Sequence, residues 1–571
     1  MNHWKKTALT VALSTSLLVT AAPFALANEA LQTTAAIFNT THNLNEQLQV
    51  QVKALYNERT SDGVRIAAVV KVNNAANKIT RIPTYELRVK TADGVEYTLA
   101  GSTTNERSVK PRSQSELSYY TMIDSTEPVE IVELQWVDVD WYTYPKTETV
   151  KLSLPVAGSA WTGFDGENQV PVHKWGESFT IPGSRSPLKF TPVSYSKQLT
   201  GEKPATIVKV LVENPTAQRE TVPEFTLYGR DNNQTFEGSR VEQSQVAVEP
   251  NEKKYIHFTI ATEQETTLSS VSVMTPIQHV TAAGASSYQV GRLSLLLPQM
   301  TFGSNVTPTP YKLGEIIAVD ELSKSINKDV DVSLVSLTLH ENQGSGYKTA
   351  VAKFKLNNKN SKPVILPNFE AELQSTDGFS YSGVRQTISR TQMVPGLSNV
   401  VSYAFTLPAS ETGENLILKL QDSIGSYRTD VAAVKTSVVE LRSDTELDLY
   451  PFKVKVDYMV PEMSYALTTG YSYKVKFDAV VTSDEKVIAD QDNSLLTIEM
   501  IDRNGHVLAQ EDVSLVGPTE TQNQLITGKN TVSFTKLRTE QVETGTSYKI
   551  YEKVNTPNGP VKRLLTTLKG F

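Results

Sequence analysis

Apolar and polar residues alternate along most of this chain. This is the spacing of β-strands that bury one face and leave the other wetter. The alternation is clearest at residues 65–72, 207–213, 351–357 and 473–481. It predicts an all-β fold of packed antiparallel sheets. Residues 320–328 alone have a helical pattern, and we expect one or two helical turns there.

Three stretches of the chain align with one another without gaps: 67–87, 207–227 and 351–371. Each has an Asn, a later Pro and an aromatic residue at the same spacing: Asn74, Pro83 and Tyr85; Asn214, Pro223 and Phe225; Asn358, Pro367 and Phe369. The Asn suits a strand end where its side chain bonds nearby backbone, and it tolerates positive φ. The Pro suits a strand start, and the aromatic ring suits a core. We therefore interpret the shared positions as structural.

Several short strands in each repeat favour a β-sandwich with Greek-key connections. We predict about four tandem immunoglobulin-like sandwiches after a signal peptide. The predicted boundaries are 1–27 for the signal, 28–160, 161–300 and 301–445 for the repeats, and 446–571 for a diverged C-terminal sandwich.

The repeat pattern resembles the immunoglobulin-like modules of uncharacterised Gram-positive secreted proteins and lipoproteins. Residues 393–396 (MVPG) and 405–408 (FTLP) carry the likeness best. The second repeat departs from it, with EPN at 249–251. The resemblance implies an extracellular array of such modules. It carries no catalytic residue.

The first residues match a secretory signal. Lys5 and Lys6 precede an apolar run, and residues 25–27 (ALA) form a cleavage site, so we expect cleavage between Ala27 and Asn28. We expect a secreted, extracellular and cell-wall-associated protein with no stable membrane span in the mature chain. Zero cysteines exclude disulfide scaffolds and thiolate chemistry. A net charge of −7 argues against nucleic acid as a partner.

Catalytic motifs are missing from the sequence. No two of the seven histidines have metal-protease spacing, and no G-x-S-x-G is present. We therefore expect no enzyme activity, and an extracellular hydrolase is the less favoured alternative. Calcium is the one candidate cofactor, because Asp329 and Asp331 offer hard oxygen ligands near a predicted domain joint.

Aromatic residues gather near the end of the first repeat. Together with two carboxylates they form the candidate sugar-stacking surface: Trp136, Asp138, Asp140, Trp141, Tyr142 and Tyr144. Aromatic faces suit the apolar faces of sugars, and carboxylates accept from sugar hydroxyls. The structural interpretation is that Trp136 fills a core and Trp141 packs at a domain joint.

We expect a non-enzymatic array with a structural, scaffolding or adhesive role at the cell envelope. Its expected partners are an envelope protein or a second copy of the chain. The alternative is a carbohydrate- or cell-wall-binding protein that uses the aromatic surface on cell-wall glycan.

Overall fold

The computed structural model describes residues 40–569, with short gaps. The gaps are 61–62, 162–169, 183, 185, 201–202, 232–233, 264, 282–283, 301–303, 342–345, 389, 440–445, 468–469, 489–494, 518–522 and 535–544. The predicted signal peptide and its cleavage site at Ala27 and Asn28 lie outside the described residues.

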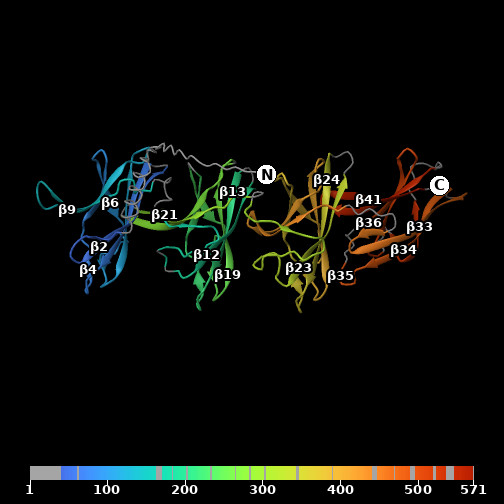
Figure 1. Cartoon of the computed structure of the whole chain (residues 1–571), viewed down its shortest axis with the longest axis horizontal. Coiled ribbons are helices and arrows are strands. Elements are labelled where there is room, and N and C mark those ends of the chain that lie inside the picture. The colour runs from blue at the N-terminus through green and yellow to red at the C-terminus, as the bar shows by residue number, and fades with distance from the viewer. Residues whose placement is uncertain are drawn as a thin grey trace, which may run out of the picture. The chain divides into compact units, whose positions relative to one another are not determined.

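The described chain is all-β, as the alternation predicts (Figure 1). Residues 320–328, where we expected helical turns, contain only turns and bends. Their loop is fixed by the Asp422 carboxylate, which accepts from Ser323 Oγ at 2.8 Å and from the Lys324 amide at 2.7 Å. The helical prediction was wrong because such hydrogen bonds favour an irregular loop over a short helix.

The chain divides into two compact units. Unit 1 holds residues 1–186, 223–239 and 265–297, and unit 2 holds the rest. The second repeat therefore contributes one sheet to each unit. The predicted domain boundaries stay predictions.

Unit 1 begins with an eight-stranded sheet that folds over one core. In spatial order its strands are β1 (His42–Asn43), β2 (Leu48–Thr60), β3 (Gly63–Asn74), β8 (Gln114–Ile123), β6 (Glu96–Gly101), β5 (Glu86–Thr91), β9 (Ile131–Asp140) and β10 (Thr147–Pro155). Two short strands, β4 (Thr80–Arg81) and β7 (Ser108–Val109), pair beside it. The core contains Leu48, Ile66, Leu87, Leu134 and Trp136.

The other sheet of unit 1 comes from the second repeat. Its order is β11 (Val172–His173), β21 (Gly284–Leu296), β20 (Ser270–Thr281), β15 (Thr226–Arg230) and β16 (Thr235–Phe236).

Unit 2 begins with the remaining strands of the second repeat. They are β12 (Lys189–Thr200), β13 (Lys203–Glu213), β19 (Lys253–Ala261) and β17 (Gly238–Arg240), with the small pair β14 (Glu220–Thr221) and β18 (Ala247–Val248).

The third repeat forms eight strands of a nine-stranded sheet around its own core, and β35 of the C-terminal segment supplies the ninth by pairing with β29. Its strands are β22 (Thr309–Pro310), β31 (Tyr427–Thr436), β30 (Leu416–Ile424), β26 (Glu370–Gln374), β27 (Ser380–Arg385), β29 (Ser398–Pro408), β24 (Tyr347–Asn358), β23 (Val330–Glu341) and β35 (Val487–Ile488). Two short strands, β25 (Val364–Ile365) and β28 (Gln392–Met393), pair beside it. Phe354, Phe369 and Tyr403 pack ring against ring inside this core.

The C-terminal segment forms two more sheets over a core of its own. One holds β32 (Glu446–Leu449), β33 (Phe452–Ala466), β34 (Gly470–Ser483) and β39 (Gly528–Phe534). The other holds β38 (Asn523–Gln524), β37 (Val507–Ser514), β36 (Leu495–Ile501), β40 (Ser547–Thr556) and β41 (Gly559–Lys569).

The repeated asparagines occupy the same site in each repeat. Asn74, Asn214 and Asn358 are buried, and each Oδ1 accepts from the amide two residues later. Each Nδ2 donates to the carbonyl four residues later and to a carbonyl on the proline loop, Val109, Val248 or Met393. The predicted backbone bond is confirmed, but all three residues keep negative φ. One buried amide thus ties two loops together.

Candidate functional site

The aromatic surface predicted from the sequence divides into a buried and an exposed part. Trp136 lies in the core of the first repeat with only 3% of its surface exposed, so its ring is not available for stacking. Trp141, Tyr142 and Tyr144 lie in the turn between β9 and β10 and are 66%, 102% and 103% exposed. The prediction was wrong for Trp136 because β9 alternates and this position faces inward.

The exposed rings belong to a hairpin end that we call the β9–β10 arm, residues 138–150. Every side chain in it except Val139 is exposed. The Lys146 ammonium lies 5.1 Å from the Trp141 ring centre, and the Asp140 carboxylate accepts from the Tyr142 amide at 2.9 Å. Figure 1 shows the turn after β9 projecting past the rest of its sheet.

Ion pairs fix the base of the arm. The Arg88 guanidinium donates to both carboxylate oxygens of Glu148, at 2.9 and 3.1 Å. The hydrogen bond from Arg88 is the largest cause that lowers the pKa of Glu148 to about 2. Asp138 keeps a looser partner, Lys151, at 3.3 Å. The arm is therefore held at its base and exposed at its end.

The two carboxylates predicted as calcium ligands pair with a neighbouring loop. Asp331 lies 2.6 Å from Lys359 Nζ, and Asp329 accepts from Asn360 Nδ2 at 2.7 Å. No group of three or more metal-ligating side chains occurs in the part of the chain that the structure describes. Calcium stays a prediction, and these contacts offer a cation-free role for both residues.

Three joints connect successive repeats, and in each the last hairpin of one repeat packs on the first sheet of the repeat before it. In joint 1, within unit 1, β20 and β21 meet β2, β3 and β8. This joint is mainly apolar: Tyr56, Val69, Trp161, Met274, Tyr288 and Val290 share one buried cluster. The rings of Tyr56 and Trp161 meet edge to face at 5.5 Å, and Ser118 and Tyr288 share a hydrogen bond of 2.8 Å.

Joint 2, within unit 2, places β31 against β12 and β13. The Lys209 ammonium is buried, donates to the Asp430 carbonyl at 2.8 Å and lies 3.6 Å from the Asp320 carboxylate. Gln198 exchanges two hydrogen bonds with the backbone of Arg428.

Joint 3, also within unit 2, places β40 and β41 against β23 and β24. Glu552 is buried between two cations, at 2.8 Å from Lys353 Nζ and 2.6 Å from Arg563 Nη2. Burial alone would raise the pKa of Glu552, but Lys353 and Arg563 outweigh it and hold that pKa well below its usual range. His340 is buried beside them, and burial lowers its pKa to about 4.

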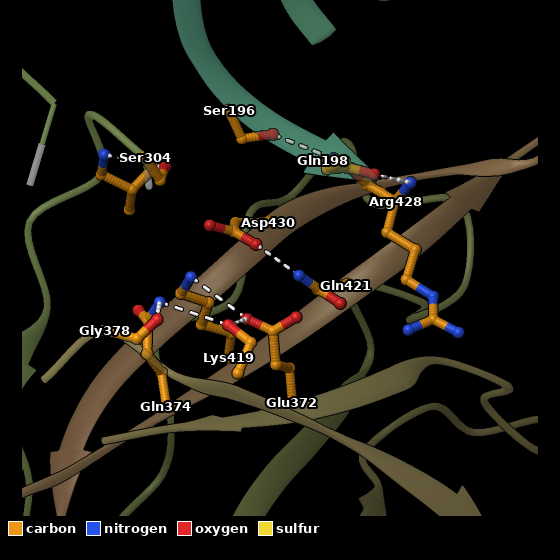
Figure 2. Close-up of polar contacts among 12 residues, drawn as sticks. Ser196, Gln198, Ser304, Glu372, Gln374, Gly378, Lys419, Gln421, Arg428 and Asp430 are labelled. Carbon is orange, nitrogen blue, oxygen red and sulfur yellow. Dashed lines mark hydrogen bonds and ion pairs between the residues drawn. The ribbon is translucent and has the colours of Figure 1, made fainter. Parts of the chain in front are cut away.

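A polar cavity of about 530 Å³ opens next to joint 2 (Figure 2). Across its floor Lys419 pairs with Glu372 at 3.2 Å, and Gln421 donates to Asp430 at 2.8 Å. Figure 2 shows these side chains beneath Gln198 of β12. Among the described residues, Gln374 Oε1, Gln421 Oε1 and Asp430 Oδ2 have no hydrogen-bond partner. These acceptors suit a hydroxyl or an ammonium group, whereas the cavity lining contains no histidine or aromatic side chain.

Sequence reasoning missed the joints. Lys209 and Lys353 stand on the outward face of their strands, where a lysine normally points into water. Their signal was present in the alignment, because both occupy the repeat position that holds Val69 in the first repeat. An apolar residue at one copy of an outward position indicates a contact there.

No helix in the described parts of the chain is long and apolar enough to cross a membrane. No family model and no curated protein matches the chain. One solved structure that matches is the crystal structure of the Pseudomonas aeruginosa CupB2 chaperone. It is 13% identical, covers 41% of this chain and 93% of its own, and has a TM-score of 0.10. A match at this TM-score carries no weight for fold or function.

Proposed function

We propose that this chain is a secreted, non-enzymatic array of four immunoglobulin-like β-sandwiches with a structural or adhesive role at the cell envelope. The observation that supports it is the repeated joint. Buried side chains such as Lys209, Lys353 and Glu552 fix one repeat against the next. Fixed joints between sandwiches serve a protein that spans distance and transmits force.

Buried charge at the joints favours this role over catalysis. The pKa of Glu552 is held below its usual range by two cations that enclose it within a packed joint. A catalytic carboxylate needs an open position beside it for substrate. The perturbation of Glu552 therefore fits an interlocking role.

The test is secretion and fractionation of the full chain in a Gram-positive host. We expect a processed protein that starts at Asn28 and is recovered in the envelope fraction. A matched chain without residues 1–27 should stay inside the cell. Recovery of the full chain in the cytosol, or turnover of any substrate by the purified protein, would contradict the proposal.

Exposure of Trp141, Tyr142 and Tyr144 favours a second candidate function, glycan binding. Mature protein would be sedimented with purified cell-wall sacculi, with and without soluble glycan. Pelleting that soluble glycan prevents, and that Trp141→Ala removes without loss of folding, would support a wall-binding role. Ile79→Ala, at an equally exposed position, is the control.

A further inference from the structure

The three joints share one geometry, and the register of their paired strands shows it. The first long strand of each repeat carries a β-bulge where it pairs with the second strand. The bulges fall before Ala54, Ser194, Ser336 and, in the C-terminal segment, Tyr458. Opposite these four residues lie Val69, Lys209, Lys353 and Asp478. The C-terminal segment therefore contains the same outward face that makes joints 1 to 3.

The final hairpins share a second bulge. It interrupts the pairing of β9 with β10, β20 with β21, β30 with β31, and β40 with β41. On the first strand of each hairpin, the residues directly after the interruption are Val137, Met274, Gln421 and Tyr551, which are equivalent. Counting onward, Asp138 of the arm corresponds to Glu552, and Asp140 corresponds to Val554. The part of each hairpin beyond the bulge is the part that enters a joint.

One copy of each surface is exposed in the part of the chain that the structure describes. The β9–β10 arm of the first repeat is exposed along nearly all its length. In the C-terminal segment, the equivalent face formed by β33 and β34 is exposed at described positions. Val460 and Val480 on this face are exposed. In joint 3 the residue equivalent to Val460 is Thr338, which is buried.

The β9–β10 arm and the β33–β34 face carry opposite charges at one pair of equivalent positions. In joint 3, Val351 packs against Val554. By register, Lys476 stands at the position of Val351, and Asp140 stands at the position of Val554. Lys476 and Asp140 are both exposed and opposite in charge, and Lys476 also pairs with Glu462 at 2.6 Å, so Asp140 would share this cation.

The charges of the wider regions also favour the contact, whereas one equivalent pair opposes it. Residues 138–150 carry three carboxylates and one lysine, whereas residues 452–483 carry four lysines and three carboxylates. One equivalent pair, Asp138 and Asp478, has like charge. Lys151, 3.3 Å from Asp138, supplies a compensating cation.

We propose that the occupant of the β33–β34 face is the β9–β10 arm of a second copy of this chain. The contact deepens the proposed structural function and rests on it. Because the two surfaces differ, the contact is heterologous, and each added copy leaves one arm and one face free. The copies therefore form a polymer that stays open unless its rotation closes a ring, and they use the joint that occurs three times inside the chain.

The test uses two blocked variants of the mature full-length protein. The arm variant combines Trp141→Ala with Val150→Glu, and the face variant is Val460→Glu. In sedimentation velocity, we expect wild type to form oligomers that grow with concentration and each variant to remain monomeric. An equimolar mixture should form one dimer and nothing larger, because only one arm and one face remain usable. Ile79→Glu and Ile365→Glu, at exposed positions elsewhere, should assemble like wild type.

Charge exchange gives a second measurement. Asp140→Lys and Lys476→Asp should each weaken assembly about tenfold, and a chain with both changes should recover it. Thermal unfolding checks that every variant is folded.

Three results would overturn the inference. They are a wild-type monomer at every concentration up to the solubility limit, a variant that still assembles alone, and a mixture that forms long oligomers. An arm variant that keeps its oligomers but no longer pellets with sacculi would also overturn it, since the arm would then serve glycan. Envelope recovery of a monomeric wild type would leave the proposed function standing while this inference fails.

Discussion

Joints 1 and 3 lie at the same place in the repeat, but joint 1 is mainly apolar and joint 3 contains a buried ion cluster. Joint 1 buries the rings of Tyr56, Trp161 and Tyr288, and joint 3 buries Lys353, Glu552 and Arg563. The shared bulge and register fix where the next hairpin lands, and the side chains then vary. An apolar joint tolerates imperfect geometry, whereas a buried ion cluster depends on every partner.

The largest expected effect comes from breaking the ion cluster of joint 3. Glu552→Ala leaves Lys353 and Arg563 buried without a carboxylate, which should cost about 3–5 kcal/mol in local stability. Hydrogen exchange of the β40 and β41 amides in the full chain measures this loss. Glu414→Ala, at an exposed position, should change it by less than about 0.5 kcal/mol. A loss below about 1 kcal/mol for Glu552→Ala would mean that the cluster is not essential to the joint.

Acid should weaken joint 3 next most strongly. His340 has a pKa of about 4 when folded, below the usual 6.5, so the unfolded form binds more protons between these values. Local stability should therefore fall as pH decreases from about 6.5 to 4, by up to about 3 kcal/mol. Glu552, with its lowered pKa, adds a further loss below about 4.5.

Hydrogen exchange of β41 at several pH values, corrected for intrinsic rates, tests the dependence. His340→Phe should remove most of the change in local stability of joint 3 above pH 4.5. Joint 1 also contains a buried histidine, His279, whose pKa burial lowers. Beside joint 1, Glu58 pairs with Arg65 but keeps about a fifth of its side chain exposed (19%), whereas Glu552 of joint 3 is 2% exposed, so joint 3 should lose more stability below pH 4.5. Equal acid responses of both joints below that pH would remove this distinction.

The smallest expected effect comes from removing one hydrogen bond in joint 1 while the packing of the ring is kept. Tyr288→Phe keeps the ring and removes the 2.8 Å bond to Ser118, which should cost about 1 kcal/mol. Exchange of the β20 and β21 amides reports it. Tyr142→Phe changes an exposed hydroxyl and is the matched control. A loss near 3 kcal/mol would show that joint 1 depends on its polar contact as joint 3 does.

Alternation predicted the all-β class because it records which side of a strand is buried. The Asn repeat predicted equivalent loops, and Asn74, Asn214 and Asn358 do tie equivalent loops. Contacts between repeats were not predictable in the same way. Val69, Lys209 and Lys353 each look like ordinary outward residues, and their partners lie far along the chain. The exposure of a single aromatic residue was also not predictable. Trp136 and Trp141 lie five positions apart, yet the first ring is in the core and the second is exposed.

The bulge before Ser336 also makes β23 sensitive to the deletion of a single residue. Removing its extra residue, Val335, would shift the rest of β23 by one position. Thr338 and His340 would then turn from the neighbouring repeat toward their own core, and Leu337 and Leu339 would turn outward. One codon thus decides which residues after the bulge stabilise their own domain and which face the next repeat. Single-residue deletions at the four bulges should be tolerated far less than substitutions there.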